Sequence, residues 1–195
     1  MLSAADVEYI RAGFVELDEL CSRHARDPAT VRADIDAGRL PRPSDVLDDG
    51  VEMVPRDYFE LADEAGSVER LREAFLRRYQ LAAAVEPEPL AEPEEEWQAY
   101  LSGEYGVCLR QVTPENIVRK SALVARIEAM LAHPDPEHPD WAERLRAAVE
   151  ELDALEREFA AFDRVRFGGP SSRDRLITGA RDLYPAIFAR EGVRS

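Results

Sequence analysis

An acidic, proline-rich segment near the middle of the chain most constrains how this sequence can fold. Residues 86–96 read EPEPLAEPEEE, and residues 81–96 contain six glutamates and no basic residue. Closely spaced prolines and mutually repelling carboxylates disfavour a packed helix. The sequence therefore predicts a linker over 81–96 that separates an N-terminal module, 1–80, from a C-terminal domain, 97–195. A solvated loop inside a single domain is the alternative.

The charge balance restricts the class of partner. The 195 residues include 40 acidic and 25 basic ones, a formal net charge of −15. Such a chain is a poor general binder of polyanions and membrane surfaces. No stretch approaches the roughly 18 apolar residues of a membrane span, and the N-terminus lacks the features of a secretory signal. We expect a cytoplasmic protein without a membrane partner. A protein or small-molecule partner is favoured over nucleic acid, with DNA as the alternative.

The N-terminal module is predicted to place helices around one hairpin. Asp27 and Pro28 are suited to the N-cap and the first position of a helix. Asp49 and Gly50, between the apolar residues of 46–54, are a strong signal of a β-hairpin. The expected fold class is mainly α: a winged helix-turn-helix-like module of helices plus one small β-hairpin, followed by an all-helical C-terminal domain.

The same module carries a motif of DNA-binding proteins. Residues 17–50, LDELCSRHARDPATVRADIDAGRLPRPSDVLDDG, resemble the N-terminal module of MerR-type regulators and excisionase-like proteins. The positions that match that family's pattern are Leu17, Leu20, Thr30, Val31, Arg32, Gly38, Leu40 and Pro41. In that family the second helix of the motif enters the major groove and the wing contacts the DNA backbone. The resemblance implies that Arg32 faces DNA from the recognition helix and that Arg39 and Arg42 lie near phosphates.

Five aspartates depart from the pattern of a DNA-binding module. Asp34 and Asp36 lie on the expected recognition helix, and Asp45, Asp48 and Asp49 lie in the expected wing. Affinity for DNA comes largely from basic side chains that neutralise phosphates. Two interpretations therefore stay open: a sequence-specific DNA-binding module, and a degenerate module that binds protein or only supports the fold.

The C-terminal domain predicts a helical hairpin. Thr113 and Pro114 are suited to the N-cap and the first position of a helix over 114–132. The helix after Pro139 has apolar residues at alternating spacings of four and three over about three heptads. These residues are Trp141, Leu145, Ala148, Leu152, Leu155, Phe159 and Phe162. We favour packing against helix 114–132 within one chain. The alternative is a seam between two copies, so we expect a monomer or a homodimer.

A candidate ligand pocket is suggested by polar residues near glycines and helix starts. Its members are Glu104, Tyr105, Arg110, Asn116, Lys120, Arg173 and Arg175. Lys120 is the only lysine in an arginine-rich chain, and a buried lysine can act as a general base or form a Schiff base. The commoner alternative is a solvated lysine on a helix. A small enzyme built on Lys120, Tyr105 and Arg110 is accordingly the third functional hypothesis, and no residue is assigned a catalytic role.

Motifs for metals and redox chemistry are weak. Cys21 and Cys108 form no CxxC pair, so we expect reduced thiols. Four residues of metal-ligand type follow helix 114–132: His133, Asp135, Glu137 and His138. Prolines space them in a loop between helices, and no metal site is expected.

The start of the last predicted helix combines capping residues with basic ones. Ser171 and Asp174 match a capping box, and the glycines and arginines of 166–175 are an alternative site for an anion. The stretch matches neither a P-loop nor a dinucleotide fingerprint, so no cofactor is expected.

Three stretches carry a resemblance over most of the chain. LPRPSDVLDDGVEMVPRDYF, YLSGEYGVCLRQVTPENIVRK and RFGGPSSRDRLI resemble a family of bacterial proteins, mainly actinobacterial, that carry the label "natural product biosynthesis protein". The resemblance implies a setting in small-molecule biosynthesis and no particular reaction. We expect an accessory protein of natural-product (secondary metabolite) biosynthesis that binds a protein partner or a small metabolite. The alternatives are a MerR-like transcriptional regulator of the pathway and the small enzyme.

Overall fold

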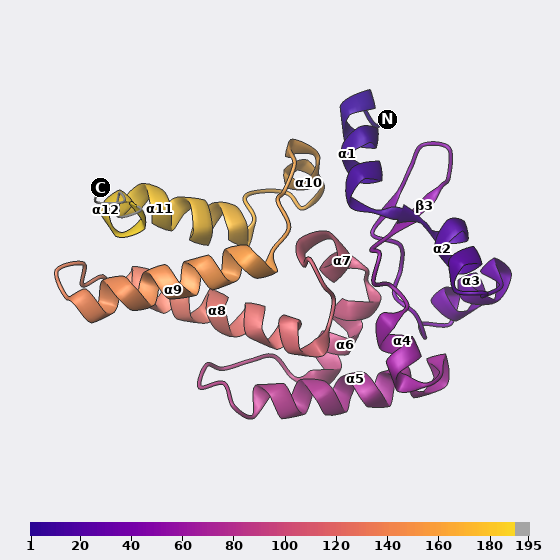
Figure 1. The fold of residues 1–195 in the computed structure, drawn as a ribbon, viewed down its shortest axis with the longest axis horizontal. Coiled ribbons are helices and arrows are strands. Elements are labelled where there is room, and N and C mark those ends of the chain that lie inside the picture. The colour runs from indigo at the N-terminus through magenta and orange to yellow at the C-terminus, as the bar shows by residue number, and fades with distance from the viewer. Residues whose placement is uncertain (190–195) are drawn as a thin grey trace, which may run out of the picture. The chain divides into compact units, whose positions relative to one another are not determined.

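The chain is mainly helical, as predicted. The computed structural model describes residues 1–189, which contain twelve α-helices, one π-helical segment and one three-stranded sheet (Figure 1). The chain divides into two compact units. Unit 1 comprises residues 1–85 and 90–118, and unit 2 comprises residues 86–89 and the chain from 119 onward.

Unit 1 begins with three helices. They are α1 (Ala4–Gly13), α2 (Leu17–Arg23) and α3 (Pro28–Asp36). The predicted start of α3 is confirmed, because the Asp27 carboxylate accepts the Thr30 N–H at 2.9 Å and Pro28 is the first residue of the helix. Gly38, just after α3, has φ of 65°, a left-handed conformation that favours glycine. The order of these helices is that expected from the sequence.

The predicted hairpin is present and forms part of a slightly larger sheet. β2 (Asp45–Val46) and β3 (Glu52–Val54) pair antiparallel, and Gly50 between them has φ of 86°. A third strand, β1 (Val15–Glu16), pairs antiparallel with β3 and gives the order β1-β3-β2. Sequence analysis does not reveal β1, since two residues are too few to display an alternating pattern.

The rest of unit 1 is helical around an aromatic core. Its helices are α4 (Glu60–Ala65), α5 (Val68–Ala83), α6 (Pro93–Leu101), α7 (Glu104–Cys108) and the first turns of α8 (Pro114–Ala132). The Phe75 ring of α5 lies 5.3 Å from Trp97 and 5.1 Å from Tyr100, both on α6. The helix expected to open the C-terminal domain therefore packs inside unit 1, and the structure divides the chain inside α8, after residue 118.

The predicted linker over 81–96 overlaps two helices at its ends and forms ion pairs with a third. α5 continues to Ala83 and α6 begins at Pro93, so only 84–92 lies outside helices. Within this stretch, residues 86–89 belong to unit 2. The repulsion expected between the glutamates is relieved because arginines of α8 pair with two of them.

Unit 2 contains the predicted helical hairpin. α8 and α9 (Pro139–Leu155) run side by side, followed by α10 (Ala161–Arg166), the π-helical η1 (Arg173–Thr178), α11 (Gly179–Leu183) and α12 (Pro185–Phe188) (Figure 1). The buried core consists of Leu123, Ile127, Trp141, Leu145, Ala148, Val149, Leu152, Leu176, Ile177 and Ala180. Packing within one chain is thus confirmed, because α8, η1 and α11 cover the apolar face of α9.

The apolar seam of α9 is shorter than predicted. α9 ends at Leu155, and Glu156 has extended backbone with ψ of 145°. Phe159 and Phe162 therefore lie outside the helix, and the Phe159 ring stacks on Phe167 with centroids 5.9 Å apart. The prediction of three heptads was wrong because Glu156, which is 2% exposed, turns inward to polar partners rather than continuing the helix.

Candidate functional site

Two of the three arginines expected to contact DNA are held by carboxylates of the same module. Arg32 Nε lies 2.7 Å from a Glu52 oxygen, and Arg32 Nη2 lies 2.7 Å from an Asp18 oxygen. The hydrogen bond to Asp18 is the largest of the effects that raise the pKa of Arg32. Arg39 pairs with Asp34 at 2.6 Å. These carboxylates therefore already provide Arg32 and Arg39 with the negative charge that DNA phosphates would provide.

The seven residues predicted to form a ligand pocket do not share one unit. Glu104, Tyr105, Arg110 and Asn116 belong to unit 1, whereas Lys120, Arg173 and Arg175 belong to unit 2. Glu104 and Arg110 are exposed, and the Asn116 amide donates a hydrogen bond to the Gln111 carbonyl at 3.1 Å. Of the seven, Tyr105 is the one that lines the cavity described below.

In unit 2 the predicted site residues form separate ion pairs. Lys120 Nζ lies 3.3 Å from Glu156, Arg173 pairs with Asp153, and Arg175 pairs with Glu128 at 3.0 Å. Lys120 is thus a largely buried, ion-paired lysine rather than a solvated one.

The alternative anion site before η1 is occupied by carboxylates of the chain. The capping box is present, since Ser171 Oγ accepts the Asp174 N–H at 3.1 Å and Asp174 accepts the Ser171 N–H at 3.0 Å. Ser172 Oγ donates to Glu156 at 2.6 Å. The capping contacts of Ser171 and the hydrogen bond from Ser172 to Glu156 account for the two hydroxyl groups of this stretch.

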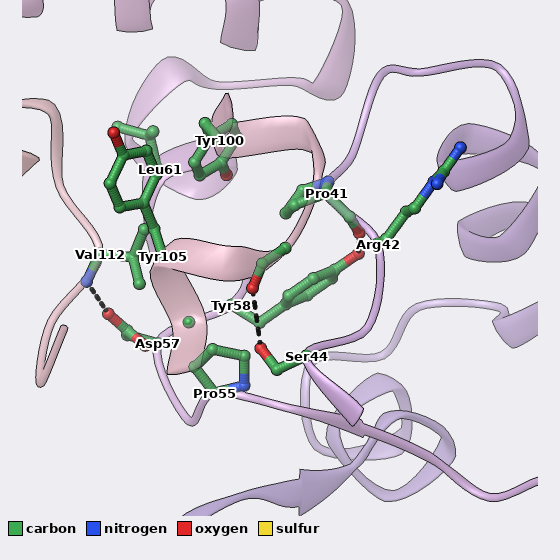
Figure 2. Close-up of a pocket in the computed structure, with 12 residues that line it drawn as sticks. Pro41, Arg42, Ser44, Pro55, Asp57, Tyr58, Leu61, Tyr100, Tyr105 and Val112 are labelled. Carbon is green, nitrogen blue, oxygen red and sulfur yellow. Dashed lines mark hydrogen bonds between the residues drawn. The ribbon is translucent and has the colours of Figure 1, made fainter. Parts of the chain in front are cut away.

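A small cavity in unit 1 brings together segments that are distant in the sequence (Figure 2). We call it the tyrosine cavity. Its volume is about 20 Å³, which is room for one group the size of a water molecule. It is lined by Pro41, Arg42, Ser44, Pro55, Asp57, Tyr58, Leu61, Tyr100, Gly103, Tyr105, Gly106 and Val112. These residues come from the segment after α3, from α4 and the segment before it, and from α6, α7 and the turns that follow them.

The walls of the tyrosine cavity form where the segment after α3 lies close to α6 and α7. The Arg42 N–H donates to the Leu101 carbonyl at 3.0 Å, which joins the segment after α3 to α6. A Cβ atom on Gly106 would lie 2.6 Å from Pro55 Cγ, and it would collide with Ser44 Oγ as well. Glycine at position 106 is thus required for α7 to lie against these residues.

Most hydroxyl protons around the cavity are already donated. Tyr58 donates to the Pro41 carbonyl, Ser44 donates to the Gly103 carbonyl at 3.3 Å, and Tyr105 donates to Glu96. The Tyr100 hydroxyl has no hydrogen-bond partner among residues 1–189, although this side chain is only 4% exposed. Burial is the main cause that raises the pKa of each tyrosine, so all three hydroxyls are neutral at physiological pH.

The fixed charge of the cavity is negative. Asp57 lines it and accepts the Val112 N–H at 2.6 Å, and Glu96, 8% exposed, lies behind Tyr105. Neither carboxylate has a cationic partner within the described part of the chain. The Arg42 side chain is exposed, and Figure 2 shows it directed away from the other lining residues. The cavity therefore suits a hydrogen-bond donor or a cation.

Sequence reasoning found one edge of this site. It singled out Tyr105 and the glycines at 103 and 106, whose spacing predicts a tight backbone path. Tyr58, Asp57 and Tyr100 were missed as site residues. The first two lie more than 40 residues from Tyr105, and no local pattern links the two segments.

A family model covers more than half of the chain. It matches residues 68–185 and describes a family of unknown function, DUF6058. The chain belongs to the DUF6058 family. The DUF6058 region begins with α5 and includes Tyr100 and Tyr105, whereas Tyr58 and Asp57 lie outside it. No curated protein and no solved structure matches the chain.

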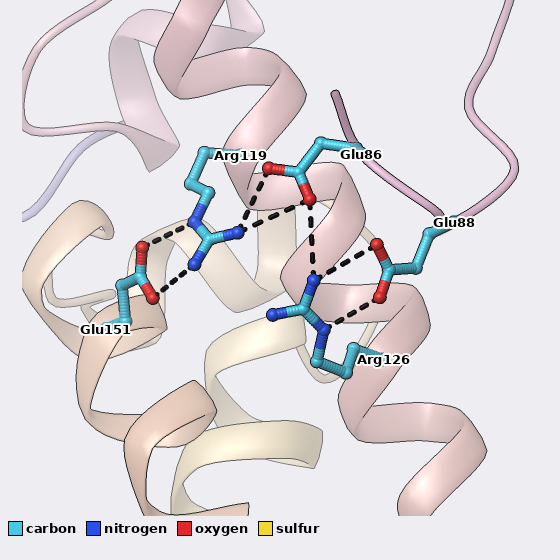
Figure 3. A network of polar contacts seen from close by, with 5 residues as sticks. All are labelled: Glu86, Glu88, Arg119, Arg126 and Glu151. Atoms are coloured by element: carbon cyan, nitrogen blue, oxygen red, sulfur yellow. Dashed lines mark hydrogen bonds and ion pairs between the residues drawn. The ribbon is translucent and has the colours of Figure 1, made fainter. Parts of the chain in front are cut away.

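A network of ion pairs in unit 2 holds the acidic segment against the DUF6058 helix α8. Arg119 reaches Glu86 at 3.0 Å and Glu151 at 2.6 Å, and Arg126 reaches Glu88 at 2.7 Å (Figure 3). The hydrogen bond to Glu151 is the largest cause that raises the pKa of Arg119. We call these five residues the glutamate clasp.

Thiols and metal-ligand residues form no site in the described residues. Cys21 is buried, burial raises the pKa of its thiol, and Cys108 is partly buried. In residues 1–189 no group of three or more histidines, cysteines or carboxylates is arranged to hold a metal ion. No helix within the same range is long and apolar enough to cross a membrane.

Proposed function

We propose that this DUF6058 protein is an accessory protein of bacterial natural-product biosynthesis that binds a basic protein partner through unit 1. The biosynthetic setting is supported by the sequence resemblance that covers most of the chain. A binding role is favoured over a catalytic one because Lys120, the candidate catalytic lysine, forms an ion pair with Glu156.

The pairing of Arg32 is the observation that carries this proposal. Asp18 and Glu52 hold its guanidinium, and Asp34 holds Arg39. Three further aspartates of the same module, Asp36, Asp48 and Asp49, are exposed. A surface with this charge repels DNA and attracts a positively charged protein, which increases the rate of association.

The tyrosine cavity suits one side chain of a protein and is too small to enclose a whole metabolite. Pockets that enclose a drug-sized ligand have volumes of about 300–1,000 Å³, whereas this cavity has about 20 Å³. A cavity of this size accepts the tip of one side chain, and such anchors contribute much of the affinity of protein–protein interfaces.

Transcriptional regulation is the second candidate function. The order of α2, α3 and the β2–β3 hairpin favours it, because this is the order expected for a winged helix-turn-helix. A regulator has to bind negatively charged DNA, whereas the proposed accessory protein has to bind a positively charged protein.

Binding measurements separate the two candidates. Fluorescence anisotropy with labelled DNA from the upstream region of its gene should show no saturable binding at low salt, where charge interactions are least screened. Purified basic proteins encoded in the same biosynthetic gene cluster should include one that binds, with an affinity that falls as salt rises. Saturable DNA binding that Arg32→Ala abolishes would overturn the proposal in favour of the regulator.

A charge-matched pair of variants tests where the partner binds. Asp36→Asn, Asp48→Asn and Asp49→Asn together should weaken partner binding at low salt, because they neutralise exposed acids of unit 1. Asp135→Asn, Glu137→Gln and Asp140→Asn remove the same number of exposed charges from unit 2 and should leave binding unchanged. Equal loss in both variants would mean that net charge alone, rather than unit 1, governs binding.

A further inference from the structure

Most of the hydroxyl groups that face the tyrosine cavity already donate their protons within the chain. Tyr58, Ser44 and Tyr105 donate their hydroxyl protons to oxygen atoms of the chain. One oxygen of Asp57 accepts the Val112 N–H, and its other oxygen has no hydrogen-bond partner among residues 1–189. Apart from the Tyr100 hydroxyl, which can donate or accept, the cavity thus offers acceptors, and a guest that satisfies them has to bring donors.

One hydroxyl of the cavity makes no hydrogen bond within the described chain. Tyr100 is 4% exposed, lines the cavity, and makes ring contacts with Phe75 and Trp97 but no hydrogen bond through its hydroxyl. The Tyr100 oxygen is not one of the buried side-chain atoms that lack a partner, so it is accessible at the cavity. A guest that enters the cavity can donate a hydrogen bond to this oxygen.

Charge and size narrow the guest to one chemical group. Asp57 and Glu96 place negative charge at the cavity without a cationic partner in the described chain, and the Arg42 side chain is directed away (Figure 2). Aromatic walls attract cations as well. An ammonium group is compact and carries three donors, whereas a guanidinium is planar and larger. A space of about 20 Å³ fits the former.

We propose that the tyrosine cavity binds the ammonium group of a lysine side chain on the basic partner protein. The inference rests on the proposed function for the identity of the lysine's source, and the charge of unit 1 supports that source. The ammonium donates to the free oxygen of Asp57 and to the Tyr100 hydroxyl oxygen, and the lysine methylenes contact Pro41, Pro55 and Leu61.

Short peptides test the proposal without a known partner. The probe is an acetylated, amidated pentapeptide with one lysine between glycines, and its controls carry norleucine, Nε-acetyllysine or arginine at that position. Binding is followed by the backbone amide signals of Gly103 and Gly106 in NMR spectra of the full chain. We expect saturable shifts with the lysine peptide and none with norleucine or Nε-acetyllysine, which lack the ammonium charge.

Conservative substitutions of Asp57 and Tyr100 test whether the lysine peptide binds in the tyrosine cavity. Asp57→Asn should weaken binding of the lysine peptide about tenfold, because it removes the negative charge that attracts the ammonium, and Tyr100→Phe should weaken it about fivefold, because it removes one acceptor. Glu60→Gln removes an exposed charge close in sequence to Asp57 but outside the cavity lining, and should change affinity less than about twofold. Thermal melts verify that each variant is folded, and the peptide series on the natural chain tests the proposal even where a variant unfolds.

The outcomes separate this inference from the proposed function. Equal binding of the norleucine and lysine peptides, or unchanged affinity in both cavity variants, overturns the lysine site. Binding of n-butylammonium with exclusion of every lysine peptide overturns a protein source and points to a free amine. A basic partner that binds Asp57→Asn as tightly as the natural chain leaves the proposed function standing and removes the cavity from it. A lysine peptide that binds when no basic protein does leaves the site standing and refutes the proposed function.

Discussion

Gly106 on α7 lies so close to Ser44 that any side chain at position 106 would collide with the serine hydroxyl. Pro55 Cγ would lie 2.6 Å from the same added Cβ. The contact joins two segments that are more than 60 residues apart in the sequence and forms one wall of the tyrosine cavity.

Gly106→Ala should therefore lower the free energy of unfolding by about 1–3 kcal/mol, the usual cost of overpacking a core. Gly179→Ala is the matched control, because its Cβ would meet the Asp174 carbonyl oxygen at an ordinary 3.4 Å and its backbone is helical. That change should be neutral or stabilise by up to about 1 kcal/mol. Urea denaturation of both variants measures the difference, and equal effects would contradict the close approach at Gly106.

Lys120→Met should destabilise the protein by about 3–5 kcal/mol, because it leaves Glu156 as an uncompensated buried charge. Lys120→Met combined with Glu156→Gln should recover most of the loss, since the neutral amide that replaces the carboxylate can still accept from Ser172. A double-mutant cycle in urea measures the coupling. A fully stable Lys120→Met protein that loses natural-product formation would instead favour the enzyme hypothesis.

Asp174 should contribute to the loss of stability in acid. Hydrogen bonds from Arg164, and then from Ser171, hold the pKa of Asp174 well below its ordinary value of 3.8. A carboxyl with a lowered pKa stabilises the fold above its unfolded value, and this stabilisation is lost as the pH falls below about 4. Asp174→Asn should cost about 1 kcal/mol at pH 7, as for other helix caps. The difference between its melting temperature and that of the natural chain should shrink steadily as the pH falls below about 4, and Arg164→Met should flatten the same acid limb.

Loss of the glutamate clasp should expose the segment 84–92 to proteases. Arg126→Met removes the partner of Glu88, so the backbone between α5 and α6 should be cut many times faster by a non-specific protease such as subtilisin. High salt should also speed up the cleavage, because it screens the partly exposed ion pairs of the glutamate clasp. Arg146→Met, at an exposed arginine of α9, is the control. Cleavage that is equally fast in the natural chain would mean that the segment is an open linker.

Several elements follow from the sequence because neighbouring residues specify them. The aspartate and proline at 27–28 begin α3, and Asp49-Gly50 turns the β2–β3 hairpin. The apolar repeat of 141–155 specifies the face of α9 that α8 covers. In each case the interactions that decide the element lie within one or two turns of the chain, where a pattern is visible.

The candidate site depends on partners that the sequence does not pair. Whether Arg32 faces solvent or is held by Glu52 depends on the placement of β3 against α3. Whether Glu86 repels its neighbours or binds Arg119 depends on where α8 lies, 33 residues away. The cavity exists because Asp57, Tyr58, Tyr100 and Tyr105 meet in three dimensions. The sequence alone determined the helical plan and its local starts and turns. The tertiary structure decided which charged side chains are paired and which hydrogen-bond acceptors remain without a partner. The reason is that many arginines and carboxylates could pair equally well by sequence, and long-range packing determines which of them lie close together.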